Sequence, residues 1–307
     1  MEYIKQRADF KIENNTVLTL GKFDGVHKGH KKLIHTMKVE AEKNNLKTAI
    51  FTFSITPKFA ISDDKYRLLT TKEEKKSIFE SENVDYLIEF PFTKETATMK
   101  PEEFIKNIIK GMINAKIVVV GTDFCFGHNR EGNINTLTKF QEKYDYKLIV
   151  VEKDKYGDGD ISSTLVRDFL KKGDIKTVNK LINGNFVIRE KVIHGNELGR
   201  KMNIPTINMR VDDTKLLPPN GVYSSFVIID GKKYKSITNI GYKPTVKEKE
   251  KILGVETHIL DFSGDLYDKI ISVYLTDRIR DEKKFASLLE LTEQMNNDIQ
   301  KTKLIDI

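Results

Sequence analysis

The feature that most constrains the fold is a strand, a glycine-punctuated loop and a helix in direct succession between Val17 and Lys43. The apolar run Val17–Leu20 predicts the strand, and we expect the helix from about Gly29 to Lys43. Gly21, Gly25 and Gly29 let the loop backbone approach a bulky anionic ligand closely. The helix N-terminus adds free N–H donors and a positive dipole end. This succession predicts an α/β domain with an anion-binding loop.

Two histidines in this loop, His27 and His30, indicate its chemistry. Imidazoles can stabilise charge that develops on phosphorus without acting as nucleophiles. The arrangement favours attack by one phosphate on the α-phosphate of a nucleotide, with pyrophosphate leaving. Two alternatives are a glycine-rich turn with surface histidines and a metal site. No Cys pair stands near these histidines to complete a zinc site.

The first half of the chain alternates strands with helices, which predicts a parallel sheet with crossovers. The predicted strands are Val17–Leu20, Thr48–Phe53, Tyr86–Glu89, Ile117–Gly121 and Leu148–Val151. The other predicted helices are Lys72–Ser81, Pro101–Met112 and Asn135–Lys143. Ligands of such sheets bind beyond the carboxyl ends of the strands, which is where the histidine loop lies.

From about Asn185 successive strands with tight turns predict an antiparallel barrel or sandwich. These strands are Val187–Val192, Val222–Ile229, Tyr234–Ile240, Leu253–Phe262 and Ile270–Leu275. A final helix is expected from about Glu282 to Lys301, with one apolar face that packs on the barrel. That face comprises Phe285, Leu288, Leu289, Thr292, Met295 and Ile299. We therefore expect two domains, residues 1–183 and residues 184–307, and expect the second to fold alone.

Two further segments belong at the edge of the first sheet. Val120–Gly127 follows the fourth predicted strand, so it lies at the same sheet edge as His27 and His30. Ile161-Ser162-Ser163-Thr164 opens another helix, with Arg167 one turn on. The hydroxyls can cap that helix, or they can hold a triphosphate together with Arg167; beside the histidine loop, the phosphate interpretation is favoured.

A second candidate site begins at His194–Lys201, where glycines and basic residues can wrap a polyphosphate. In Ile204–Asn208, the Thr206 hydroxyl and the Asn208 carbonyl are oxygen ligands of the kind that Mg²⁺ takes in small number. The alternative is a proline-containing turn that enters a strand. Strand alternation puts Glu256 on one face with His258, where its carboxylate could accept a proton from a substrate hydroxyl; otherwise it is a surface glutamate.

The first-half motifs resemble the flavin-adenylylating branch of the nucleotidyltransferase superfamily. The matches are Gly21-x-Phe23-Asp24-Gly25-x-His27-x-Gly29-His30, Val120-Gly121-x-Asp123-Phe124-x-Phe126-Gly127 and Ile161-Ser162-Ser163-Thr164-x-x-Arg167. The resemblance implies catalysis by His27 and His30. It implies nucleotide binding by Gly21, Phe23, Asp24, Gly25, Gly29, Asp123, Phe124, Gly127, Ser162, Ser163, Thr164 and Arg167. One segment departs from the family: Phe53-Ser54-Ile55-Thr56-Pro57 stands where Phe-x-Pro-His-Pro is frequent.

The second half resembles riboflavin kinase, with Ile207 in the alanine position of a Pro-Thr-Ala-Asn motif. The resemblance implies that Glu256 is the base and that Thr206 and Asn208 hold Mg²⁺. It implies that nucleotide is bound by Gly195, Gly199, Arg200, Pro205, Thr206, Asn208 and Tyr223. It implies that flavin is bound by Asn239, Gly241 and Thr245.

Together the motifs resemble the bifunctional bacterial riboflavin kinase/FAD synthetases. The resemblance implies an α/β Rossmann-like nucleotidyltransferase domain, then an antiparallel β-barrel with a C-terminal helix. The barrel would make FMN from riboflavin and ATP, and the first domain would make FAD and pyrophosphate from FMN and ATP, both with Mg²⁺. The alternative suggested by the altered Phe53–Pro57 segment is that only one activity is retained.

Composition and charge indicate the kind of ligand and the cellular location. The net charge of +7 comes from interspersed residues without a long basic arm, so we expect small phosphate ligands as partners and no nucleic acid. Met1–Arg7 has no apolar core of a signal peptide, no apolar run is long enough to span a membrane, and Cys125 is the single cysteine. We therefore expect a cytoplasmic protein, with weak self-association left open.

Overall fold

The computed structural model describes residues 1–54, 67–195, 204–243, 252–305 and 307. Contacts within the chain divide it into two compact units. The second unit comprises residues 163–307 together with the short segment 67–74, and the remaining described residues form the first. The second unit therefore begins before the expected domain boundary at 183/184 and also takes in a segment from the first half of the sequence.

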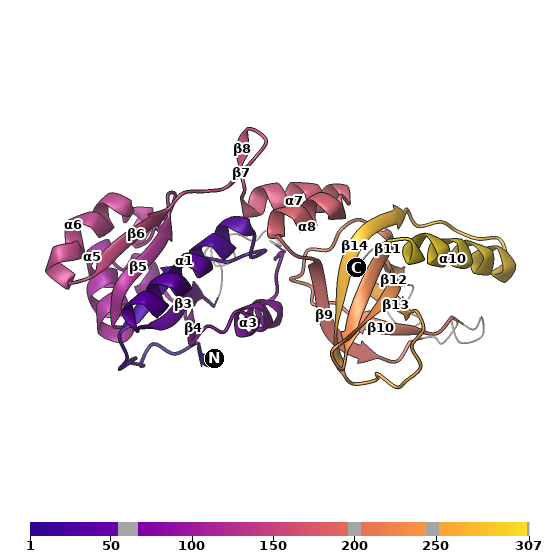
Figure 1. The fold of residues 1–307 in the computed structure, drawn as a ribbon, viewed down its shortest axis with the longest axis horizontal. Helices are drawn as coiled ribbons and strands as arrows, with labels where there is room; N and C mark the ends of the chain where they lie inside the picture. The colour runs from indigo at the N-terminus through magenta and orange to yellow at the C-terminus, as the bar shows by residue number, and fades with distance from the viewer. Residues whose placement is uncertain (55–66, 196–203, 244–251, 306) are drawn as a thin grey trace. The chain divides into compact units, whose positions relative to one another are not determined.

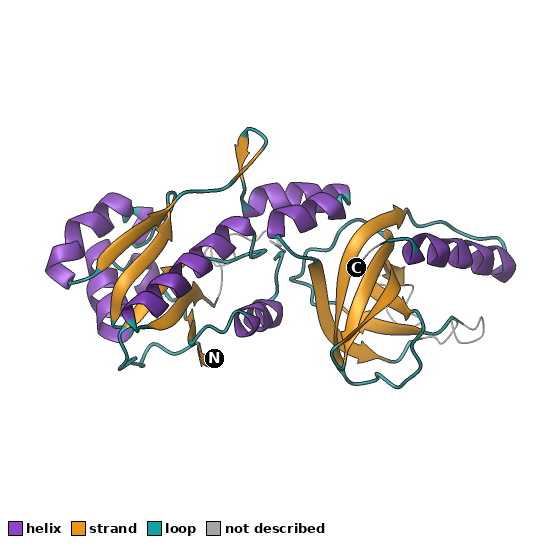
Figure 2. Ribbon diagram, in the orientation of Figure 1, coloured by secondary structure: helices purple, strands orange, loops and turns teal. Residues whose placement is uncertain are grey.

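The first unit is built on a six-stranded parallel sheet (Figure 2) with the order β1-β4-β3-β2-β5-β6. The strands are β1 (Glu2–Lys5), β2 (Thr16–Leu20), β3 (Lys47–Phe53), β4 (Tyr86–Phe90), β5 (Ala115–Gly121) and β6 (Lys147–Val151). β2 lies between β3 and β5, so the loop after β2 opens at the middle of the carboxyl edge. The alternating strand–helix pattern is confirmed, and β1 is an additional edge strand that the sequence pattern did not reveal.

Helices cover both faces of this sheet (Figure 1). They are α1 (Lys28–Asn44), α3 (Lys72–Ser81), α4 (Lys94–Thr98), α5 (Pro101–Glu103), the π-helix η1 (Phe104–Met112), the 3₁₀ turn η2 (His128–Arg130) and α6 (Ile134–Tyr144). Ile34 and Met37 of α1 pack with Phe79 on one face, and Ile105 and Ile108 of η1 pack on the other. Because alternate strand residues face opposite sides, the apolar strands are buried on both faces. A two-stranded hairpin, β7 (Lys155–Tyr156) and β8 (Gly159–Asp160), completes the unit.

The second unit is a closed antiparallel barrel with the order β10-β13-β12-β11-β14-β9. Its strands are β9 (Phe186–Ile193), β10 (Thr206–Arg210), β11 (Gly221–Ile229), β12 (Lys232–Lys243), β13 (Ile252–Ile259) and β14 (Ile270–Arg280). Two helices precede the barrel, α7 (Ser163–Lys172) and α8 (Ile175–Ile182), and α8 packs on β9 and β14. The predicted antiparallel barrel is confirmed, with β10 as a further strand after the proline-containing turn.

Alternation along the strands separates the barrel interior from its outer face. Ser225, Ser236, Thr238 and Thr257 are fully buried, and their hydroxyls bond one another at 2.7–2.9 Å. These residues mark the inward positions of β11, β12 and β13. The residues next to them along each strand, including Glu256 beside Thr257, therefore point outward.

The C-terminal helix α10 (Leu288–Lys303) packs on β12, as expected, but it begins later than predicted. Ser287 caps it by accepting a hydrogen bond from Glu290 N, at 3.2 Å. The predicted apolar face was wrong at Leu289, whose side chain is 70% exposed. The face that meets the barrel instead contains buried Asp298, which pairs with Arg280 at 2.8 Å, and buried Thr302.

Candidate active sites

The histidine loop after β2 has an unusual backbone. Phe23, Gly25 and Val26 all have positive φ angles, of 49°, 81° and 36°. Such angles are costly for a bulky or β-branched residue and persist only where the surroundings enforce them. The Phe23 ring supplies part of that enforcement, because it is fully buried and packs edge-on against Phe79 at 5.5 Å. The loop is therefore held in one strained, preformed shape.

The two imidazoles lie one upon the other at the start of α1. Their ring centroids are 3.8 Å apart, and Phe23 contacts the His30 ring at 5.1 Å. α1 begins at Lys28. His27 occupies its N-cap position, but the His27 side chain makes no capping hydrogen bond. Gly29 leaves room for the His27 ring, since a Cβ at that position would lie 3.3 Å from it. Both Nδ1 atoms are buried and lack a hydrogen-bond partner among the described residues.

Burial keeps both imidazoles uncharged near neutral pH. It lowers the pKa of His27 to about 4, against the opposing attraction of Asp24 and Asp123. Burial, His27 and Lys75 hold the pKa of His30 well below its ordinary value. Buried polar groups are normally hydrogen-bonded. Each neutral imidazole carries one N–H, so the two rings at this helix N-terminus can each donate one hydrogen bond to an anionic ligand.

The loop after β5 reaches the same sheet edge, as predicted. The negative charge of Asp123 favours protonation of His27 and so opposes the lowering of its pKa. The Asp123 carboxylate also pairs with the Lys153 ammonium at 2.8 Å. Next to it, Phe124 and Phe126 stack at 5.6 Å, and Gly127 adopts a positive φ of 72°. The structure thus brings Asp24, Asp123 and the two histidines into one electrostatic environment.

A shallow pocket opens beside these groups in the first unit. It is lined by Thr122, Asp123, Phe124, Cys125, Asn133, Ile134 and Asn135. Asn133 caps α6 and accepts a hydrogen bond from Thr136 N at 3.2 Å, which fixes one wall. The pocket places the predicted residues Asp123 and Phe124 on a surface that a ligand can reach.

Sequence reasoning missed Lys153 at this edge. It follows β6 by two residues, and its ammonium pairs with Asp123 and, at 3.7 Å, with Asp160. The rule that ligands bind beyond the carboxyl ends of parallel strands could have selected it. Its signal was lost because lysines are abundant throughout this chain.

The Ser-Ser-Thr segment falls where the two units divide. Ser162 ends the first unit, whereas Ser163, Thr164 and Arg167 begin the second on α7. Arg167 is buried and donates from Nη1 to the carbonyl of Arg67. Ser163, Thr164 and Arg167 therefore belong to a different unit from Ser162, His27 and His30, and the phosphate-binding role of the segment stays a prediction.

The second candidate site lies on the outer face of the barrel, across three neighbouring strands. Asn208 of β10 is paired with Glu256 of β13, and Glu256 is paired with Asn239 of β12. Directly paired residues of antiparallel strands project to the same face with neighbouring Cβ atoms. The register therefore places an amide, a carboxylate and a second amide in one row. Ile207 pairs with the inward residue Thr257, so it faces the interior and separates Thr206 from Asn208 without entering this row.

Two contacts hold the β10 end of the row. A Cβ on Gly195 would lie 2.3 Å from the Asn208 amide nitrogen, so any other residue there would displace the Asn208 side chain. Thr206 pairs with His258, whose Nδ1 donates to the carbonyl of Pro205 at 2.7 Å. Thr206 and Asn208 share the outer face with Glu256, and their oxygen donors suit Mg²⁺. The backbone thus brings Gly195, Thr206, Asn208 and Glu256 together, and their roles in binding and catalysis stay predictions.

Other predicted residues lie elsewhere or outside the described part of the chain. Tyr223 is fully buried in the barrel, and its hydroxyl donates to the carbonyl of Pro219; burial raises its pKa to about 12. Gly241 lies against the Glu282 carboxylate, which occupies the space of a Cβ. The predictions for Gly199, Arg200 and Thr245, and the altered positions 55–57, lie outside the described residues.

The geometry of the histidine pair does not favour metal binding. In the described ranges, no three His, Cys, Asp or Glu side chains gather as a metal site. The His27 and His30 rings stack face to face, whereas ligands to one ion point their nitrogens at a common centre. The hydrogen-bonding interpretation of the histidines is the one that this geometry favours.

Comparisons with known proteins agree with the two predicted domain types and their order. The FAD synthetase family model matches residues 9–165, and the riboflavin kinase family model matches residues 182–305. A bifunctional riboflavin kinase/FMN adenylyltransferase of Buchnera aphidicola subsp. Schizaphis graminum (strain Sg) is 35% identical over 94% of both chains. The protein of that name in Bacillus subtilis (strain 168) is 36% identical over 93% of this chain and 90% of its own length.

A solved structure has the same fold over its full length. It is described as a macrolide-efflux protein from Streptococcus pneumoniae, and it is 31% identical with a TM-score of 0.88 over 99% of both chains. Within the described part of this chain, no helix combines the length and apolar character needed to cross a membrane. Both matching family models name flavin-nucleotide synthesis, and the chain belongs to the family of bifunctional riboflavin kinase/FMN adenylyltransferases.

Proposed function

We propose that this chain carries out two successive reactions in the cytoplasm. Residues 184–307 transfer the γ-phosphoryl group of ATP to riboflavin, giving FMN and ADP. Residues 1–183 then join FMN to the AMP part of a second ATP, giving FAD and pyrophosphate. The observation that supports this proposal is that each family domain contains a cluster of the predicted residues: the stacked imidazole pair of the first unit and the Asn208–Glu256–Asn239 row of the second.

In the adenylyltransferase, His27 and His30 donate hydrogen bonds from neutral rings to the α-phosphate region of ATP. Gly21, Gly25 and Gly29 keep the loop close to the phosphates, and the N-terminus of α1 faces their charge. Phe23, Asp24, Asp123, Phe124 and Gly127 complete the nucleotide site, to which Ser162, Ser163, Thr164 and Arg167 contribute. The FMN phosphate is the nucleophile, so no side chain needs to form a covalent bond to the nucleotide.

In the kinase, Glu256 accepts the proton of the ribityl hydroxyl as its oxygen attacks the γ-phosphate. Gly195, Gly199, Arg200, Pro205 and Tyr223 contribute to the nucleotide site, and Asn239, Gly241 and Thr245 contribute to the flavin site. Thr206 and Asn208 would hold Mg²⁺, because both present oxygen donors on the outer face beside Glu256. When bound, Mg²⁺ neutralises phosphate charge.

The ligands of this proposal are small molecules: ATP, riboflavin, FMN and FAD with Mg²⁺, and no nucleic acid. The basic and acidic residues alternate along the chain, as in Lys72-Glu73-Glu74-Lys75. Such a surface attracts small phosphates without forming a nucleic-acid track. Weak self-association is left open by this pattern.

Two incubations test the activities, one with riboflavin and one with FMN in its place. In the first, the protein is mixed with riboflavin, ATP and Mg²⁺, and the products are separated by chromatography. FMN and FAD together are expected. FMN alone would restrict the function to the kinase, which is the single-activity alternative raised by the altered Phe53–Pro57 segment. FAD from supplied FMN, without phosphorylation of riboflavin, would restrict it to the adenylyltransferase, and neither product would overturn the proposal.

A further inference from the structure

The barrel seam between β9 and β10 is short. β9 pairs with β14 over six residue pairs, from Phe186↔Leu275 to Lys191↔Ile270, but it pairs with β10 only at Val192↔Met209 and Ile193↔Asn208. Backbone groups of alternate residues along a strand point to opposite neighbours. The groups of Val187 and Arg189 on the β10 side of β9 therefore need other partners.

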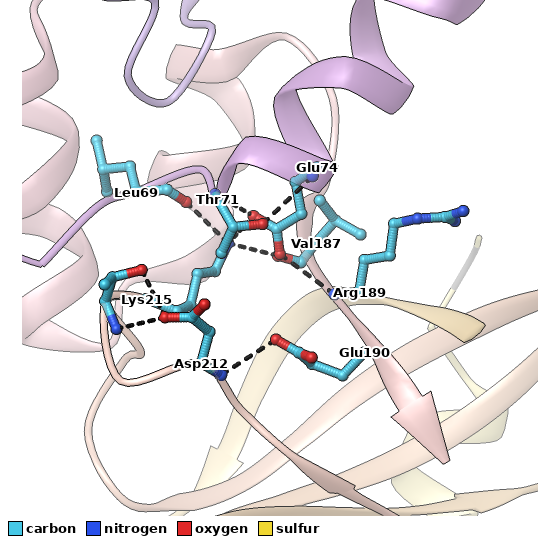
Figure 3. Close-up of polar contacts among 9 residues, drawn as sticks. Leu69, Thr71, Glu74, Val187, Arg189, Glu190, Asp212 and Lys215 are labelled. Carbon is cyan, nitrogen blue, oxygen red and sulfur yellow. Dashed lines mark hydrogen bonds and ion pairs between the residues drawn. The ribbon is translucent and has the colours of Figure 1, made fainter. Parts of the chain in front are cut away.

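Side chains of a buried ion pair take the place of the missing strand. The Val187 carbonyl accepts a hydrogen bond from Lys215 Nζ at 2.8 Å, and the Arg189 N–H donates to Glu74 Oε1 at 3.2 Å. Lys215 and Glu74 also bond each other, and the side chain of each is only 1% exposed (Figure 3). The pair continues the seam along β9 beyond the last backbone pairing with β10.

The pair is fully connected to its surroundings. Besides Glu74 and Val187, Lys215 Nζ donates to the Leu69 carbonyl at 2.8 Å, so all three ammonium protons have acceptors. Its ammonium also lies 4.4 Å from the centre of the Phe186 ring. Glu74 Oε2 accepts from Thr71 N at 2.9 Å. A buried pair with every donor used fixes the position of the elements that it joins.

Glu74 reaches the barrel from the first half of the sequence. Residues 67–74 belong to the barrel unit, where Leu68 forms a parallel bridge with Lys215. The Leu216 N–H donates to the Leu68 carbonyl at 2.7 Å, and Leu69 is 2% exposed. We call residues 67–74 the strap. The strap completes a seam that residues 184–307 leave open.

We propose that Glu74 and Lys215 are positioning residues for riboflavin phosphorylation, an inference that rests on the function proposed above. They fix β9 at Val187 and Arg189, and β9 ends where Ile193 pairs with Asn208 and Gly195 lies against the Asn208 amide. Asn208 is paired in turn with Glu256. Loss of the pair frees β9 and loosens the Gly195–Asn208 contact, which should weaken MgATP binding more than the chemical step.

The test compares three full-length variants with the parent. Lys215→Met removes the ammonium but leaves the bonds between Thr71 and Glu74 at the start of α3. The double variant Glu74→Leu/Lys215→Met removes both charges and leaves no buried ion unpaired, so it should be more stable than the single variant. Lys191→Met is the matched control, because Lys191 also lies on β9 and the substitution breaks only its exposed ion pair with Asp268.

The readouts are KM for MgATP and kcat for riboflavin phosphorylation, together with hydrogen exchange at the Arg189 amide. For the double variant we expect KM to rise about tenfold with kcat changed less than about threefold, as a loss of positioning rather than of chemistry requires. The Arg189 amide should exchange at least about tenfold faster, and Lys191→Met should match the parent. A folded double variant with the parental KM, or an equal rise in Lys191→Met, overturns the inference. A parent that makes no FMN overturns the proposed kinase function instead.

Discussion

Truncation at residue 184 should abolish folding of the barrel, although the change from alternating to all-strand pattern near Gly184 predicts an independent domain there. Such a fragment lacks α7 and α8. These helices bury five apolar side chains, each at most 1% exposed: Val166, Leu170, Ile175, Val178 and Leu181. At about 1.5–3 kcal/mol for each buried side chain, their loss removes about 8–15 kcal/mol. That is the whole stability of a typical domain, about 5–15 kcal/mol.

Polar contacts add to this loss. Asn179 of α8 donates to the Leu275 carbonyl and accepts from the Phe186 N–H, both at 2.8 Å, so it ties β9 to β14. A fragment of residues 163–307 keeps these bonds but still lacks the strap. It leaves Lys215 without Glu74, and breaking a buried pair by removing one partner costs about 3–5 kcal/mol. The longer fragment should therefore fold with a clearly lower Tm than the full chain.

Circular-dichroism melts of the two fragments and the full chain measure these differences. The fragment 184–307 should show no cooperative transition, and 163–307 should melt below the full chain. A synthetic peptide of residues 67–81 should raise the Tm of 163–307 by mass action, since it binds only the folded state. A peptide with Glu74→Gln is the control and should raise it less. A cooperative melt of 184–307 with parental riboflavin phosphorylation would refute the reasoning.

Four further outcomes are expected. His27→Ala and His30→Ala should each raise the activation barrier of FAD formation by about 2–4 kcal/mol, while FMN formation persists. Chromatography of both flavins measures the two rates. Glu256→Gln should slow riboflavin phosphorylation roughly 10²–10⁴-fold and leave ATP binding and FMN adenylylation intact in calorimetric and product assays. Thr206→Ala should weaken MgATP binding as well as turnover, which a titration with and without Mg²⁺ distinguishes. Burial lowers the pKa of His27 from 6.5 to about 4, so between these pH values the unfolded chain binds a proton that the folded chain does not. The free energy of unfolding should therefore fall as the pH drops through this range, by about 3 kcal/mol. In denaturant melts His27→Asn should lose less stability in acid than the parent, and an equal loss would contradict the shift.

Local pattern was sufficient for most elements of the fold. The strand–loop–helix at Val17–Lys43 and the helix at Lys72–Ser81 were visible because hydrophobic periodicity and glycines mark them strongly. The helix expected over Pro101–Met112 exists as a short α-turn that continues as a π-helix. β1, with charged residues at both ends of a four-residue strand, carries no such signal. Its place at the sheet edge comes from pairing with β4, which is a non-local contact.

The extent of the barrel unit could not be predicted from local pattern for a similar reason. α7 and α8 look like further members of the alternating first half, and only their contacts assign them to the second unit. The strap is harder still, because Glu74 stands in a run of charged residues that reads as a solvated helix face. Its burial depends on Lys215, 141 positions later in the chain. A sequence contains both residues but does not show that they meet.

In the candidate sites, too, local pattern predicted some features and non-local contacts determine the others. Identity and spacing of His27 and His30 were predictable, because a ten-residue motif on a known kind of loop specifies them. Their protonation was not, since it arises from burial beneath elements that the motif does not include: Phe79, which supports Phe23 from α3, and Lys75, which repels a proton on His30. Neutral rings suit the proposed chemistry, because a donor that stays uncharged before ATP arrives has no counter-ion to lose when the phosphates bind. The fold therefore contributes the electrostatic state of the site, whereas the motif contributes its atoms.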